Sequence, residues 1–136
     1  MERDRRWIVA ALLLGVLLLP ACRAASSGTD ESEPYTLESI EGTELSRVIL
    51  TAKGAERIGL ETTTVVGGTV PASAIWIDVD GQEWVYTSPE PLTFVREAVI
   101  VDRYEGDVAM LSDGPTSGTE IVIVGVAELI GSEFGI

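Results

Sequence analysis

Residues 70–87, "VPASAIWIDVDGQEWVYT", give the strongest indication of the fold. It contains the dipeptide Asp80-Gly81, which favours the tight turn of a two-stranded hairpin. Before the turn, Ile75, Ile77 and Val79 alternate with polar or aromatic neighbours, the pattern of a strand with one buried and one wet face. After the turn, the segment is rich in aromatic and β-branched residues. We therefore predict two antiparallel strands on the two sides of this turn.

Strand signals recur on both sides of this hairpin. A second hairpin is predicted around Glu105-Gly106. A short helix is predicted over residues 51–59, because Thr51 can cap its start and Gly59 can end it. The remaining predicted strands are residues 45–50, 60–66, 92–104, 107–113 and 119–129, with a loop at 114–118. About seven short strands and one small helix predict a mainly β chain that forms a compact β-roll or barrel-like domain.

The first 21 residues resemble a bacterial lipoprotein signal peptide. A weakly basic start precedes an apolar run from Trp7 to Leu19, whose 13 residues are too few to span a bilayer. The run ends in Leu19-Pro20-Ala21-Cys22, which is similar to the lipobox at which such signals are cleaved. We therefore predict that Cys22 begins the mature protein and carries a lipid anchor. The alternative is an ordinary signal peptide, or an uncleaved anchor, with a chance cysteine.

From Cys22 onward the chain divides into a tether and a domain. Residues 22–44 are small, polar and acidic, and at least their first half is predicted to be disordered. Residues 45–136 contain the predicted strands and suffice for one folded domain. The whole chain has 22 acidic and 9 basic residues and a net charge of −13. This charge argues against nucleic acid and against an anionic lipid surface as partners, because both would repel the chain. Membrane contact is therefore expected through the lipid anchor or through a protein.

Signals for catalysis and cofactors are weak. The chain has no histidine and one cysteine, which excludes Ser-His-Asp and Cys-His arrangements, and Lys53 is its sole lysine. Residues 78–81, "DVDG", resemble part of a calcium loop. In that frame, however, Trp76 and Thr87 would occupy the first and last ligand positions, so a hairpin turn is the better interpretation. We expect no enzyme activity, no cofactor and no bound metal.

Three segments carry a family pattern in a fixed order: "VILTAKGAERIGLETTTV" (48–65), "VPASAIWIDVDGQEWVYT" (70–87) and "FVREAVIVDRYEGDVAMLSDGPTSGTEIVIVGVAEL" (94–129). Together they resemble the opening strand and helix, the hairpin and the closing strands of the periplasmic adaptors (membrane fusion proteins) of resistance–nodulation–division (RND) efflux pumps. Full adaptors insert a lipoyl-like domain, a helical hairpin and a β-barrel where this chain has only Gly67-Gly68-Thr69. The resemblance therefore implies the membrane-proximal β-roll domain alone, without the hairpin that reaches an outer-membrane channel.

Four aromatic residues are the candidate docking residues: Trp76, Trp84, Tyr86 and Phe134. The first three lie on the predicted hairpin, where Trp84 and Tyr86 share one face. Exposed aromatic residues are enriched at protein interfaces. The alternative for the hairpin residues is a stabilising cross-strand pair. Phe134 lies near the chain end, so it could instead pack back onto the domain.

These features predict a lipid-anchored protein without enzyme activity on the extracytoplasmic face of a bacterial membrane. As an adaptor-type module it would dock on a polytopic export transporter of the RND or a similar kind. The alternative is a lipoprotein that binds a solute, peptide or cation without a transporter partner. The sequence predicts neither the transported substrate nor an oligomeric state.

Overall fold

The computed structural model describes residues 33–136, and the predicted signal peptide and lipidated Cys22 lie outside these residues. The described part is mainly β, with nine strands and two α-helices. Its elements in chain order are β1 (Tyr35–Ser39), β2 (Ser46–Leu50), α1 (Ala52–Ile58), β3 (Glu61–Thr64), β4 (Thr69–Pro71), the 3₁₀ turn η1 (Ala72–Ala74), β5 (Trp76–Ile77), β6 (Glu83–Glu90), β7 (Thr93–Glu105), β8 (Val108–Asp113), β9 (Glu120–Val124) and α2 (Val126–Phe134).

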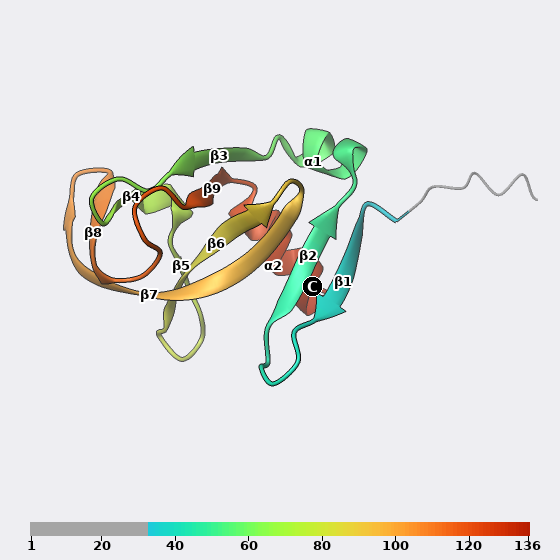
Figure 1. Cartoon of the computed structure of the whole chain (residues 1–136), viewed down its shortest axis with the longest axis horizontal. Helices are drawn as coiled ribbons and strands as arrows, with labels where there is room; N and C mark the ends of the chain where they lie inside the picture. The colour runs from blue at the N-terminus through green and yellow to red at the C-terminus, as the bar shows by residue number, and fades with distance from the viewer. Residues whose placement is uncertain (1–32) are drawn as a thin grey trace, which may run out of the picture. The chain divides into compact units, whose positions relative to one another are not determined.

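Strand β7 organises the sheet because it takes part in both of its halves (Figure 1). Its first half lies between β2 and β6 in the antiparallel order β1-β2-β7-β6-β9-β3. Its second half pairs with β8, which in turn pairs with β4. The register between β7 and β8 shifts on both sides of Val101, and such bulges increase the bend and twist of a strand. The sheet therefore rolls up, which confirms the predicted mainly β, roll-like fold.

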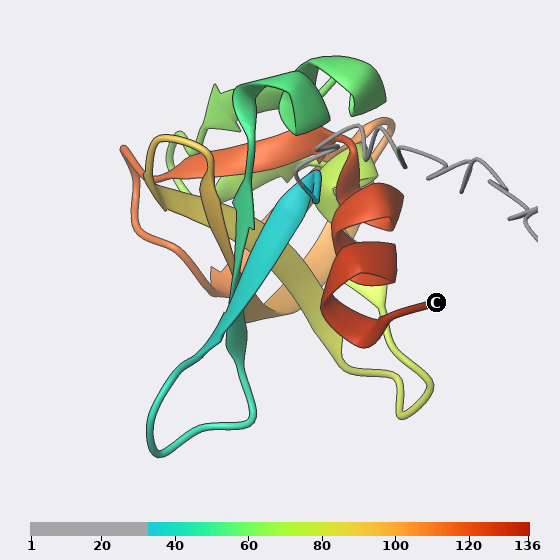
Figure 2. The same cartoon turned by 90° about the vertical axis from the view of Figure 1, so that its right-hand side faces the viewer.

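Two hydrophobic cores lie on the two faces of the sheet. Successive residues of one strand point to opposite faces, so Val85 enters one core and the adjacent Tyr86 enters the other. The inner core, inside the roll, contains Val65, Val70, Ala74, Val85, Val99, Ala109 and Ile121. The helix-side core contains Val48, Leu50, Tyr86, Phe94, Val122 and Leu129, the last of these from α2. Figure 2 shows α2 beside the β1–β2 hairpin, the face that this second core fills.

Helix α1 follows the sequence prediction closely. The Thr51 hydroxyl accepts a hydrogen bond of 2.9 Å from the Gly54 amide, which satisfies a donor in the first turn. Gly59 ends the helix with φ +64°, a conformation that glycine adopts without steric penalty.

The hairpin of residues 70–87 has the predicted turn but not the predicted first strand. Trp76 pairs with Trp84 and Ile77 with Glu83 across a turn in which Gly81 has φ +82°. Ahead of β5, however, the chain forms β4 and then the 3₁₀ turn η1, and this turn reverses the predicted alternation. Ile77 is consequently 55% exposed and Val79 fully exposed, whereas Trp76 is partly buried.

The prediction of one strand over residues 119–129 is wrong in its second half. Strand β9 ends at Val124, and Gly125, with φ +96°, begins helix α2. Val126, Leu129 and Ile130 have the spacing of one helical face, and they pack on the helix-side core. The domain therefore has two α-helices, not the single small helix that was expected.

Part of the predicted tether belongs to the folded domain. Residues 35–39, assigned to the tether from their composition, form β1, which pairs with β2 from Tyr35↔Leu50 to Ser39↔Ser46. This short segment forms a strand because the open edge of β2 supplies backbone hydrogen-bond partners, which composition alone does not reveal. Within residues 33–136, no helix is long and apolar enough to cross a membrane.

Candidate functional site

A groove of about 580 Å³ lies where the C-terminal end of α2 meets two loops, residues 40–45 after β1 and residues 78–82 after β5. We call it the aromatic groove. Strands β5 and β6 contribute Trp76 and Trp84, strand β7 contributes Arg96, and the end of the chain contributes Phe134 and Ile136. Its volume lies in the range of about 300–1,000 Å³ that is usual for binding sites.

The aromatic rings are brought together by strand pairing and by α2. Trp76 and Trp84 are opposite residues of β5 and β6, so their side chains are neighbours on one face. The ring of Phe134 lies 5.7 Å from that of Trp76, centroid to centroid, at an interplanar angle of 53°. This separation is within the range of favourable aromatic pairs. The end of α2 therefore packs on the β5–β6 hairpin through its last aromatic residue.

Arg96 is stacked between two of these rings. Its guanidinium carbon lies 4.6 Å from the centroid of Trp84 and 5.0 Å from that of Phe134. Both distances permit cation–π attraction, which is strongest when the cation is shielded from water. The Arg96 side chain is only 11% exposed. The positive charge thus lies within the wall of the aromatic groove and does not project from it.

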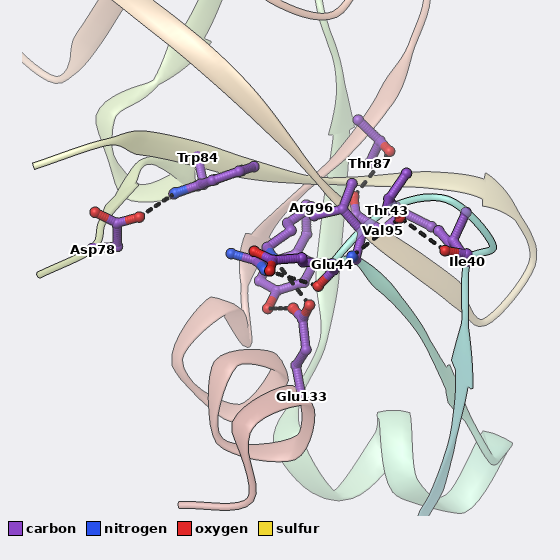
Figure 3. Close-up of polar contacts among 11 residues, drawn as sticks. Ile40, Thr43, Glu44, Asp78, Trp84, Thr87, Val95, Arg96 and Glu133 are labelled. Atoms are coloured by element: carbon purple, nitrogen blue, oxygen red, sulfur yellow. Dashed lines mark hydrogen bonds and ion pairs between the residues drawn. The ribbon is translucent and has the colours of Figure 1, made fainter. Parts of the chain in front are cut away.

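Glu133 balances this charge from α2. Its Oε1 forms an ion pair of 3.0 Å with Nε of Arg96, and its Oε2 accepts a hydrogen bond of 2.6 Å from the hydroxyl of Tyr86. Burial, together with the adjacent Glu133 carboxylate, raises the pKa of the Tyr86 hydroxyl well above its usual value, so this group remains a donor. Figure 3 shows Glu133 reaching from α2 toward Arg96.

Asp78 orders the second loop of the aromatic groove. Its Oδ1 accepts hydrogen bonds of 2.9 Å from the backbone amides of Asp80 and Gln82, and its Oδ2 accepts one of 2.9 Å from Nε1 of Trp84 (Figure 3). The bond from Trp84, followed by the backbone bonds, lowers the pKa of the Asp78 carboxyl. The residue therefore stays ionised at neutral pH and fixes the Trp84 ring relative to the loop.

The rim of the aromatic groove is both apolar and acidic. Val79 is fully exposed, Ile136 is 91% exposed and Phe134 is 46% exposed. Within residues 33–136, the carboxylates of Glu44 and Asp80 have no hydrogen-bond or ion-pair partner. Since Glu133 compensates Arg96, the uncompensated charge at the rim is negative.

The structure gathers three of the four predicted docking residues at this one place. Trp76, Trp84 and Phe134 line the aromatic groove. Tyr86 does not, because it is fully buried in the helix-side core and its ring is inaccessible to a partner. Its hydroxyl acts behind the groove wall, on Glu133. The predicted lipidation site, Cys22, lies outside the described residues.

Sequence reasoning missed Arg96 and Glu133. A single arginine within the apolar segment "TFVREAV" of β7 was the available signal, because a charge on a buried strand needs a partner. That partner lies 37 positions away, in a segment that was not predicted to be helical. No local pattern could therefore connect the two residues.

Aromatic and arginine side chains, which line the centre of the aromatic groove, are enriched at protein interfaces. The exposed side chains of Val79 and Ile136 add apolar surface at its rim. Among residues 33–136, no group of three or more His, Cys, Asp or Glu side chains is placed to hold a metal ion.

Comparison of the chain with protein-family models, with curated proteins and with solved structures found no match.

Proposed function

We propose that this chain is a membrane-tethered docking module. A lipid on Cys22 would hold it at the extracytoplasmic face of a bacterial membrane, and the aromatic groove would bind a polytopic export transporter. The observation that carries the proposal is the meeting of Trp76, Trp84 and Phe134 in one groove bordered by exposed Val79 and Ile136. Exposed apolar groups gathered around aromatic anchors are what a protein partner buries.

The distance from the anchor limits the choice of partner. Twelve residues, 23–34, separate Cys22 from β1, and they can span at most about 40 Å when fully extended. In Figures 1 and 2, β1 runs from Tyr35 toward the loop 40–45. Glu44 and Leu45 of this loop line the aromatic groove, so the groove lies at the end of β1 opposite to Tyr35. The surface that this geometry favours is the extracytoplasmic portion of a neighbouring membrane protein.

The choice of an export transporter rests on the resemblance of residues 48–129 to RND adaptors. In that family the membrane-proximal domain, made from both ends of the chain, sits on the transporter. A β-roll of the observed kind is consistent with that domain. Bridging to an outer-membrane channel is not part of the proposal, because only Gly67-Gly68-Thr69 stands where the long hairpin is inserted in full adaptors.

Site-specific photocrosslinking in cells tests this proposal. A photoreactive amino acid at Val79, at the groove rim, should capture a polytopic membrane transporter that mass spectrometry identifies. The same group at Val66, which is 67% exposed but does not line the groove, is the matched control and should not capture it. Recovery of only soluble proteins at Val79 would contradict docking and favour the solute- or peptide-binding alternative.

The anchor is tested separately. Replacing Cys22 by serine should move the protein from the membrane fraction to the soluble fraction, because the thioether to the lipid cannot form. Mass spectrometry of the wild-type N-terminus should show the lipid on Cys22. A protein that still sediments with membranes after Cys22→Ser would show that another element anchors it.

A further inference from the structure

On the basis of the proposed function, we infer that the aromatic groove recognises a basic segment of its partner: a lysine or arginine side chain flanked by apolar side chains.

The charges at the rim give the first argument. The guanidinium of Arg96 is already paired with Glu133 at 3.0 Å and stacked on Trp84 and Phe134, so it offers little to an incoming anion. The charges that remain are three carboxylates, those of Glu44, Asp78 and Asp80. An acidic segment would be repelled by them and a basic one attracted.

The availability of these carboxylates gives the second argument. Within the described residues, Glu44 and Asp80 make no hydrogen bond or ion pair through their side chains, so an ammonium or guanidinium group would not have to displace a partner. Asp78 is engaged by three N–H groups and acts chiefly as a fixed negative charge. Carboxylates beside aromatic faces provide both kinds of attraction that proteins use for organic cations.

The apolar rim indicates a peptide and not a small cation. Val79 stands fully exposed at the tip of the loop 78–82, and Ile136 is 91% exposed at the chain end. A lone cation seated on the carboxylates would leave these side chains in water. Apolar residues on either side of a lysine or arginine would cover them and add hydrophobic burial to the ion pairs.

Peptide binding to the full-chain protein in detergent tests the inference. The probe is a fluorescein-labelled peptide, Leu-Arg-Leu-Lys-Leu, and its anisotropy reports binding. Leu-Glu-Leu-Glu-Leu reverses the charge, and Gly-Arg-Gly-Lys-Gly keeps the charge without the apolar side chains. We expect the first peptide to bind, the acidic one not to bind, and the glycine peptide to bind more weakly.

Two charge-matched variants locate the binding. Glu44→Gln/Asp80→Asn removes two carboxylates of the rim and should weaken binding of the basic peptide about tenfold. Glu56→Gln/Glu61→Gln removes two exposed carboxylates that do not line the groove and should leave affinity nearly unchanged. The side chains in neither pair make a hydrogen bond within residues 33–136, so both double variants should fold.

Several results would overturn the inference: equal weakening in both double variants, equal binding of the acidic peptide, or no binding of the basic peptide. Its failure is distinguishable from failure of the proposed function. If the crosslink from Val79 to the transporter survives in Glu44→Gln/Asp80→Asn, docking stands and recognition of a basic segment is rejected. If that crosslink is absent from the wild type as well, docking is rejected.

Discussion

Arg96 on β7 and Glu133 on α2 form an ion pair of 3.0 Å in which the side chains are only 11% and 3% exposed. This pair, with the Tyr86 hydroxyl on the other carboxylate oxygen, ties the last turn of α2 to the sheet. Because Phe134 follows Glu133 directly, the same pair sets the position of one wall of the aromatic groove.

Breaking this pair from one side should be strongly destabilising. In Arg96→Met, the Glu133 carboxylate stays buried without its cation. We expect the free energy of unfolding, measured in urea, to decrease by about 3 kcal/mol. The double variant Arg96→Met/Glu133→Gln removes both charges and should recover part of this loss. The matched control is Arg103→Met on the same strand, whose ion pairs with Asp102 and Glu105 are more than half exposed and should contribute little to stability. Similar losses for Arg96→Met and Arg103→Met would contradict the expectation.

The Tyr86 hydroxyl should contribute to stability and to its pH dependence. In Tyr86→Phe, the buried Glu133 loses a donor at 2.6 Å, and we expect a loss of about 1.5–3 kcal/mol in the free energy of unfolding. Tyr104→Phe, whose hydroxyl lies 3.3 Å from Glu83 at an exposed position, should lose far less.

The alkaline limit of the fold follows from the same tyrosine. Burial raises the pKa of Tyr86 in the folded state, so the folded protein holds its proton longer than the unfolded chain does. Stability from this group is therefore complete below the unfolded pKa of about 10 and decreases as the pH rises above it. Denaturant unfolding at a series of alkaline pH values should show this decline in the wild type and a smaller one in Tyr86→Phe. Equal declines in both proteins would count against the buried tyrosine as the cause.

Glu97 should destabilise the fold at neutral pH. Burial first, and then the nearby Asp113, raise the pKa of the Glu97 carboxyl. The folded state therefore favours the protonated acid. The stability that Glu97 contributes is complete below the unfolded pKa of about 4.3 and is lost as the pH rises through the higher folded pKa. We expect Glu97→Gln to raise the melting temperature at pH 7. The gain in the free energy of unfolding should be under about 1 kcal/mol, because the Glu97 side chain is partly solvated. At pH 4 the substitution should have little effect. Glu56→Gln, on the exposed side of α1, is the matched control for the loss of a carboxylate.

Gly54 should not tolerate a methyl group, although it lies in a helix. A Cβ atom at this position would clash with the carbonyl oxygen of Pro34, which also accepts a hydrogen bond of 2.9 Å from the Thr51 amide. The clash should outweigh the gain of about 1 kcal/mol that alanine brings to a helix, giving a net loss of about 1–3 kcal/mol. Lys53→Ala, one residue away and exposed, should be neutral or slightly stabilising. Hydrogen exchange of β1 amides should accelerate in Gly54→Ala alone, since Pro34 leads into that strand.

The sequence predicted those parts of the fold whose signals are local. The turn at Asp80-Gly81, the turn at Glu105-Gly106 and the capped helix after Thr51 each depend on a few adjacent residues, and all three are present in the structure. The roll follows from many short antiparallel strands. The prediction for residues 70–80 is wrong because a 3₁₀ turn before Trp76 shifts the alternation of buried and exposed side chains by one residue. A shift of one residue exchanges the two faces of a strand.

The site was predicted only in part because α2 was missed. The apolar face of α2 consists of Val126, Leu129 and Ile130, and it begins directly after the apolar strand β9. In the sequence, the strand and the helix therefore look like one continuous apolar segment, which only Gly125 interrupts. Without α2, nothing in the sequence places Glu133 beside Arg96. Trp76, Trp84 and Phe134 could be proposed as aromatic anchors, but their convergence depends on that helix.

Asp78→Asn should release Trp84 without unfolding the domain. An asparagine at this position can still accept backbone N–H groups with its one oxygen, but an amide nitrogen in place of Oδ2 cannot accept from the indole. We therefore expect faster hydrogen exchange of the Trp84 indole N–H by NMR, with the melting temperature little changed because Asp78 is at the surface.

Acidification should have the same effect in the wild type, because the pKa of the Asp78 carboxyl is lowered in the folded state. The hydrogen bond between Asp78 and Trp84 is intact above about pH 3.9 and is lost as the pH falls through the folded pKa. Asp80→Asn is the matched control, since its side chain bonds no described residue, and Trp84 exchange should not change there. Equal exchange in Asp78→Asn and the wild type would mean that the loop, and not this hydrogen bond, holds the indole that lines the groove.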